Sequence, residues 1–230
     1  LLAKALFPGD VYAYGGLYHY LPPSVVDARD FAAQARRLLA AGCDGIKMLE
    51  GKPTCYKDVK LALNAPELDA FYAMLEAERV ALLFHVADPE EFWDSEHAPR
   101  WAKDLGWQYD ESFATKQQLY DEVDDVLTRF PALCVVFAHF NFLSADVKRA
   151  AQFMERHPNA CLDLTPGVEM YYNFARRPGD WRASRRATRR STCACRRRTT
   201  RWTWCAARST SRCASAQPGW GRASRSSRRR

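Results

Sequence analysis

The sequence has no apolar stretch close to the roughly 20 residues that a membrane-spanning helix needs, and no charged-then-apolar leader. We therefore expect a cytoplasmic protein that is neither secreted nor membrane-bound. The chain begins with Leu1 rather than Met, so we expect its natural start to lie upstream.

The C-terminal stretch lacks most of the residues that build a hydrophobic core. From Arg182 to Arg230 there is no Leu, Ile, Val, Met, Phe or Tyr and no Lys, Asp or Glu, whereas Arg occurs 16 times. So little aliphatic surface cannot offset an ordering cost of roughly 1–2 kcal/mol per residue. We therefore expect residues 182–230 to form a disordered, non-globular tail.

The composition of this tail is what GC-rich coding DNA gives when it is read out of frame, and we infer a frameshift near residue 182. Two other interpretations stay open. A metal knuckle would use Cys193, Cys195, Cys205 and Cys213, but their spacing is not that of paired C-x2-C motifs and no His accompanies them. An Arg-rich arm with interleaved Trp would bind nucleic acid. The frameshift is favoured over both.

Residues 1–181 are acidic, although the whole chain has a formal net charge of +7. They hold 18 of the 34 basic residues and all 27 acidic residues. An acidic body with scattered charge indicates an enzyme with a small-molecule substrate rather than a nucleic-acid-binding protein. A homo-oligomeric state stays open.

Apolar runs alternate with amphipathic segments along residues 1–181. The predicted strands are 11–14, 45–49, 80–84, 133–138 and 161–164, and helices are predicted to start near Asp27, Glu67, Lys116 and Ser144. Five strands alternating with four helices predict an α/β fold, in which helices cover a parallel sheet. Alternation alone does not say whether the sheet closes into a barrel.

Two histidines stand out because each ends a buried apolar strand. His85 follows strand 80–84, and His139 ends strand 133–138. The carboxyl ends of parallel strands form the floor of the active site in α/β enzymes, where an imidazole can ligate a metal or transfer a proton. One such histidine is as readily a structural residue bonded to backbone carbonyls, but two on consecutive strands favour a function.

Charged residues near the strand ends are further candidates, each with a structural alternative. Lys47 lies inside the second predicted strand, where a cation is costly unless it reaches the mouth of the site or a partner. Glu50 and Lys52 follow that strand and either contact substrate or are solvated loop charges. The acidic segment Asp88–Glu91 suits the start of a helix, and we interpret it as structural.

Three short motifs carry a family resemblance. They are Gly45-Ile46-Lys47-Met48, Leu83-Phe84-His85-Val86 followed by Asp88-Pro89, and Phe130-Pro131 leading to Val136-Phe137-Ala138-His139. Their order and spacing resemble the amidohydrolase superfamily, in the branch that includes aminocarboxymuconate-semialdehyde decarboxylase. The resemblance spans residues 1–181 and implies that they form an incomplete TIM-like (β/α)8 barrel.

The resemblance also implies a bound divalent metal, commonly Zn²⁺, with Mn²⁺ as an alternative. Family members hold the metal with a His-x-His pair on the first strand, a His on the fifth and an Asp on the eighth. By resemblance His85 is the fifth-strand metal ligand, and His139 is the sixth-strand catalytic histidine that polarises substrate or activates water. Lys47 matches a catalytic lysine of the fourth-strand region, whose carboxylation stays open. No His-x-His occurs in the chain, and nothing after residue 181 resembles the last strand.

The implied activity is metal-dependent hydrolysis of a carbonyl-type substrate. The alternatives are a metal-dependent decarboxylase or hydratase using the same site, an inactive fragment, and an Arg-rich nucleic-acid-binding protein. Because only one of the usual four metal ligands is present, we expect the activity of this chain to be impaired.

Overall fold

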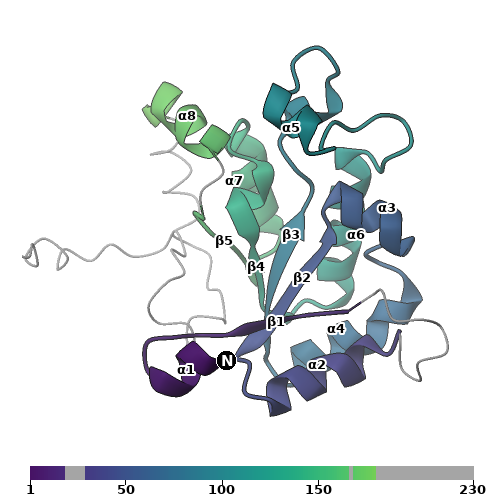
Figure 1. Cartoon of the computed structure of the whole chain (residues 1–230), viewed down its shortest axis with the longest axis vertical. Helices are drawn as coiled ribbons and strands as arrows, with labels where there is room; N and C mark the ends of the chain where they lie inside the picture. The colour runs from purple at the N-terminus through teal and green to yellow at the C-terminus, as the bar shows by residue number, and fades with distance from the viewer. Residues whose placement is uncertain (19–28, 166–167, 180–230) are drawn as a thin grey trace, which may run out of the picture.

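A computed structural model describes residues 1–18, 29–165 and 168–179, and these form an α/β structure around one sheet (Figure 1). The strands are β1 (Tyr14–Gly16), β2 (Gly45–Gly51), β3 (Ala81–Val86), β4 (Val135–Phe137) and β5 (Ala160–Leu162). Every neighbouring pair is parallel, and the order across the sheet is β1-β2-β3-β4-β5. The predicted α/β class with five parallel strands is therefore confirmed. The predicted tail, its alternatives and Asp27 lie outside the described residues.

The helices fall mainly between the strands, as alternation in the sequence predicts. The α-helices are α1 (Leu2–Leu6), α2 (Phe31–Ala40), α3 (Pro53–Val59), α4 (Asp69–Ala77), α5 (Arg100–Asp104), α6 (Lys116–Arg129), α7 (Val147–Arg156) and α8 (Val168–Arg176). Short 3-10 helices are η1 (Pro66–Leu68), η2 (Glu90–Trp93) and η3 (Ala138–Phe142). Within the described part of the chain, no helix has both the length and the apolar character needed to cross a membrane.

Strand order answers the question that alternation left open. Each strand pairs with the next one in the sequence, as in a barrel, whereas a doubly wound sheet reverses its order at a switch point. Over the described ranges, β1 and β5 are the two edges of the sheet. The arrangement is that of consecutive βα units laid side by side in one direction.

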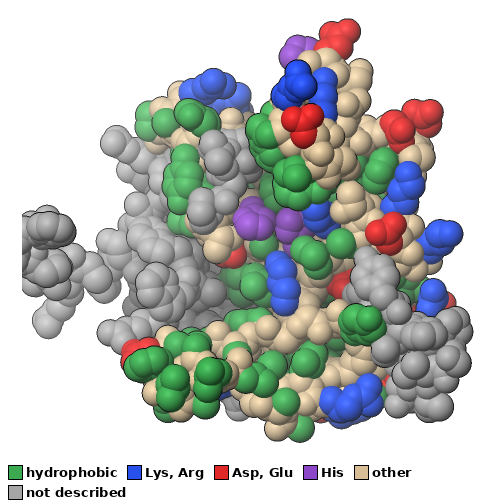
Figure 2. All heavy atoms as spheres, in the orientation of Figure 1, with side chains coloured by type: hydrophobic (Ala, Val, Ile, Leu, Met, Phe, Trp, Pro, Cys, Tyr) green, Lys and Arg blue, Asp and Glu red, His purple; other side chains and the backbone are tan. Residues whose placement is uncertain are grey.

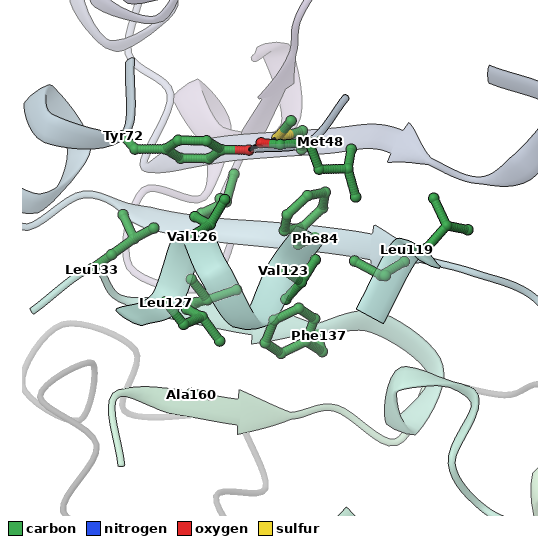
Figure 3. Close-up of a cluster of buried hydrophobic side chains, with 14 of the residues drawn as sticks. Met48, Tyr72, Phe84, Leu119, Val123, Val126, Leu127, Leu133, Phe137 and Ala160 are labelled. Carbon is green, nitrogen blue, oxygen red and sulfur yellow. Dashed lines mark hydrogen bonds between the residues drawn. The ribbon is translucent and has the colours of Figure 1, made fainter. Parts of the chain in front are cut away.

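One face of the sheet packs against the helices. Met48, Phe84 and Phe137 occupy matching positions on β2, β3 and β4, and all three are buried. Figure 3 shows these side chains gathered with residues of α6, including Leu119 and Val123. The rings of Phe84 and Phe137 stack with their centroids 6.0 Å apart. Since side chains alternate along a strand, the intervening residues face the other side of the sheet.

Several predicted boundaries are wrong by a few residues. β3 continues to Val86, so His85 lies inside the strand rather than just beyond it. β4 ends at Phe137, before the predicted end at Ala138. The predicted cap Ser144 is also wrong, because the carboxylate of Asp146 accepts the helix-capping hydrogen bond from the Arg149 amide. The predicted loop after β2 contains α3, which begins with Pro53, a residue suited to a first helical turn.

Removing the Phe137 ring should be costly, because it leaves a cavity between the sheet and the helices. We expect Phe137→Ala to lower the free energy of unfolding by about 3–5 kcal/mol in urea titrations. Leu105→Ala is the control, since Leu105 is 58% exposed, and it should change stability by less than about 0.5 kcal/mol. Equal effects of the two substitutions would contradict this description of the core.

Candidate active site

The two histidines singled out by the sequence lie side by side. The ring centroids of His85 and His139 are 5.2 Å apart, and the rings meet edge to face at 75°. The Phe142 ring touches both, at 5.2 Å from His85 and 5.3 Å from His139. Figure 2 shows histidine side chains together near the middle of the visible face, with basic side chains beside them. The structure thus brings the pair into one place, at the carboxyl ends of β3 and β4.

His85 owes its direction to strand alternation. It follows Phe84, which faces the helices, so its imidazole points to the opposite face, where it is 7% exposed. The backbone of β2 passes very close at this point. A Cβ atom added at Gly51 would lie 2.4 Å from the His85 carbonyl oxygen, so only glycine fits there without a shift.

His139 reaches the same place through an unusual turn. Its φ is 56°, and Phe140, Asn141 and Phe142 also have positive φ, a region that costs roughly 1–2 kcal/mol for each such residue. Asp163 holds the start of this turn, because its Oδ1 accepts from the His139 amide at 2.6 Å and its carbonyl accepts from the Phe140 amide at 3.0 Å. Because of this turn, the His139 side chain does not point toward the helices as Phe137 does, and it contacts His85 instead.

A buried carboxylate joins His85 to two distant segments. Asp88 is 3% exposed, and its Oδ1 lies 3.3 Å from Nε2 of His85. Its Oδ2 accepts from Lys52 Nζ at 2.7 Å and from the Tyr109 hydroxyl at 2.5 Å. Burial raises the pKa of Asp88, but His85 and Lys52 lower it by more, so the group stays ionised. Burial and the Asp88 carboxylate raise the pKa of Tyr109, which keeps its donating proton.

Each imidazole has one nitrogen engaged. Burial lowers the pKa of His85 below its usual value, although Asp88 opposes this, so the ring is neutral at pH 7. Its Nε2 faces Asp88. In His139, Nδ1 lies 3.2 Å from Oγ1 and 3.4 Å from the carbonyl oxygen of Thr165. From these contacts we assign the protons to the engaged nitrogens, which leaves Nδ1 of His85 and Nε2 of His139 as lone-pair donors.

Lys47 shares the sheet face of His85. It pairs in register with Leu83, two residues before His85 on β3. Burial lowers the pKa of Lys47, while Asp163 and Glu50 act in the opposite direction. Glu50 is itself buried, and burial raises its pKa to about 7. Lys47 is therefore close enough to His85 to lower the pKa of its imidazole, and Glu50 is close enough to Lys47 to raise the pKa of its ammonium.

Imidazole is a suitable ligand for a divalent metal, but the pair supplies too few ligands for a complete metal site. A metal-ligating histidine normally donates its other ring N–H to a carboxylate or carbonyl, as His85 does to Asp88. A catalytic zinc site has three protein ligands, however. Among the described residues, no group of three or more His, Cys, Asp or Glu side chains could hold a metal ion.

The sequence did not identify all of the residues that surround the pair. Asp88 was interpreted as a helix start, although it lies three residues after His85, and Lys52 was left between substrate contact and solvent. Tyr109 lies in a long loop without any pattern that would single it out. Asp163 lies inside the predicted strand 161–164, but β5 ends at Leu162, so Asp163 directly follows the observed strand and the rule applied to the histidines would have found it only with the correct strand end.

The fold and site can be set beside known proteins. No curated protein sequence matches the chain. One similar solved structure is an uncharacterised TIM-barrel protein from Bordetella bronchiseptica, with 16% sequence identity and a TM-score of 0.48. The match covers 75% of this chain and 48% of that one, so the chain spans about half the length of that protein.

A family model described as Amidohydrolase matches residues 13–198, which include all five strands as well as Lys47, His85 and His139. Amidohydrolases are generally metal-dependent enzymes, which agrees with a pair of imidazoles in contact at the strand ends. On the extent of this match, the chain belongs to the amidohydrolase family.

Proposed function

We propose that this chain is a metal-dependent hydrolase that acts on a carbonyl-type small molecule, such as a lactone or an amide. The observation that supports this most is the contact of His85 with His139, 5.2 Å apart at the carboxyl ends of adjacent parallel strands. Membership of the amidohydrolase family supports the reaction class. Because the chain spans about half of a structural neighbour, the activity of the whole protein is part of the proposal.

His85 is the proposed metal ligand. Its imidazole is neutral at pH 7, which is the form that binds a metal, and Asp88 fixes the ring through Nε2. Zn²⁺ is the ion we propose, with Mn²⁺ as the alternative. When bound, such an ion would supply Lewis-acid polarisation of the substrate carbonyl. Among the described residues, His85 does not belong to any group of three or more side chains that could hold the ion.

His139 is the proposed proton carrier. Its Nε2 accepts a proton from the attacking water, while Nδ1–H stays directed at Thr165. The Thr165 hydroxyl in turn donates to Asp163 Oδ1 at 2.7 Å, so the ring is held in one tautomer. After the tetrahedral intermediate forms, the same imidazole returns the proton to the leaving group. This use of one base and acid is typical of hydrolysis at a carbonyl carbon.

Lys47 is the proposed electrostatic contributor. It extends from β2 on the face that carries His85, where burial lowers its pKa while Asp163 and Glu50 raise it. An ammonium group placed there stabilises negative charge that develops on the carbonyl oxygen. Carboxylation of Lys47 would reverse its charge and make it a ligand, and mass spectrometry of the intact chain distinguishes the two forms.

A decarboxylase of the aminocarboxymuconate-semialdehyde type is the second candidate. The motifs around Lys47, His85 and His139 resemble that branch of the family. Both reactions need the same imidazole pair, but a decarboxylase takes a carboxylated ring rather than an ester or amide. A panel of lactones, amides and aromatic carboxylates, assayed with Zn²⁺ or Mn²⁺, therefore separates the two.

Replacing the proton carrier should abolish most of the turnover. On the best substrate of the panel, we expect His139→Gln to lower kcat by about 10²- to 10⁴-fold, because proton transfer by a positioned histidine contributes that much. His97→Gln is the matched control, since the His97 side chain is 74% exposed and bonds only to Asp94 nearby. Equal activities of the two variants would contradict the role of His139.

Metal content tests the role of His85 independently of turnover. We expect the purified chain to bind Zn²⁺ weakly and to lose it to a mild chelator, because His85 is one proposed ligand where a catalytic site has three. His85→Ala should weaken this binding further in equilibrium dialysis, whereas His97→Gln should not. Zinc retained at one equivalent through dialysis would contradict the expected weak binding, and unchanged binding by His85→Ala would overturn the role of His85 as a ligand.

A further inference from the structure

A cavity of about 310 Å³ lies next to the imidazole pair. Its wall comes from the loops after β3 and β4, from the first turns of α6 and α7, and from α8, and it includes Glu90, Lys116, Phe142, Ser144, Arg149 and Asn173. Phe142 is the link between the two places, because its ring also touches His85 and His139. The volume is at the lower end of the range for small-molecule pockets.

Lys116 brings a buried positive charge to this cavity. Its side chain is only 9% exposed, although it is the first residue of α6. Nζ donates to the Phe142 carbonyl oxygen at 3.2 Å and lies 3.1 Å from Glu90 Oε2. An ammonium group has three protons, and two of them are directed at these partners within the described part of the chain. The third proton is available to a ligand in the cavity. Burial lowers the pKa of Lys116, while Glu90 and Glu91 act in the opposite direction.

Glu90 is a counter-ion that a ligand can replace. Its side chain is 72% exposed, so it reaches the Lys116 ammonium from the solvent side of the cavity. Ion pairs with a solvated partner contribute little to stability, with a median of about 0–1 kcal/mol. A carboxylate that enters the cavity would meet the same ammonium in a less solvated setting and could release Glu90 to water.

The other charged residues that line the cavity determine which kind of anion it can bind. Arg149 adds a second cation, placed over the Tyr120 ring at 4.7 Å and bonded to Gln117 at 2.6 Å. The Asp146 carboxylate already accepts the capping bond from the Arg149 amide. Glu90 and Glu91 would repel a doubly charged group such as phosphate. A singly charged, planar carboxylate suits this balance.

We propose that this cavity binds the carboxylate of a small organic acid, with Lys116 as the main contact and Glu90 as the intramolecular group that the acid displaces. The apolar part of the ligand would lie against Phe142 and Leu143, which also line the cavity. Neither His85 nor His139 takes part, so this site stands independently of the proposed hydrolysis.

Benzoate binding to the full chain tests the proposal, with calorimetry as the readout. We expect benzoate to bind at least about tenfold more tightly than neutral benzamide or inorganic phosphate, since a charged hydrogen bond is worth that much. Lys116→Met should weaken benzoate binding by about tenfold or more. Glu90→Gln should tighten it several-fold by removing the competitor, and Lys148→Met, an exposed lysine on α7, should change nothing.

The opposite signs of these effects make the test decisive. A Lys116–Glu90 pair that serves only as a structural tie predicts that both substitutions lower stability and that neither affects benzoate. Equal binding of benzoate and benzamide, or weaker binding by Glu90→Gln, would overturn the proposal. If Lys116→Met does not fold by circular dichroism, Arg149→Met replaces it and should weaken binding several-fold. His85→Ala should bind benzoate normally even if it has lost hydrolysis.

Discussion

The in-register parallel pairing of β3 with β4 is the constraint on which the rest of the site depends. Leu83 lies opposite Val136 and Phe84 opposite Phe137, so the residues that follow this pair, His85 and His139, come to the same edge of the sheet. The stacked pair Phe84 and Phe137 fixes this register from the helical side. A shift of one residue would exchange the two faces and send His85 into the core.

Hydrogen bonds from other segments of the chain then position the two histidines. Asp88 bonds to His85, to Lys52 from the β2 side and to Tyr109 from the loop after α5, so three separate segments converge on one carboxylate. Asp163, which follows β5, accepts a hydrogen bond from the backbone amide of His139. Asp88 thus contacts the His85 imidazole directly, whereas Asp163 positions His139 through its amide and through Thr165.

The sequence predicts the strands and the two histidines well, because both follow from local patterns. Apolar runs mark β3 and β4, and the strand-end rule places His85 and His139 at one edge. The same patterns could not predict the left-handed turn at His139, since none of its four residues is glycine. Nor could they predict that Tyr109 contacts Asp88, which depends on how a long loop folds back over the sheet.

The left-handed turn also has a consequence for how distant parts of the molecule communicate. Its last carbonyl, that of Phe142, is held by the Lys116 ammonium, while its first amide, that of His139, is held by Asp163. A molecule that moves the Lys116 ammonium would break its hydrogen bond to the Phe142 carbonyl at one end of the turn. The other end of the turn positions the His139 imidazole. The occupancy of the cavity and the aim of His139 would then be thermodynamically coupled, and the influence would be mutual.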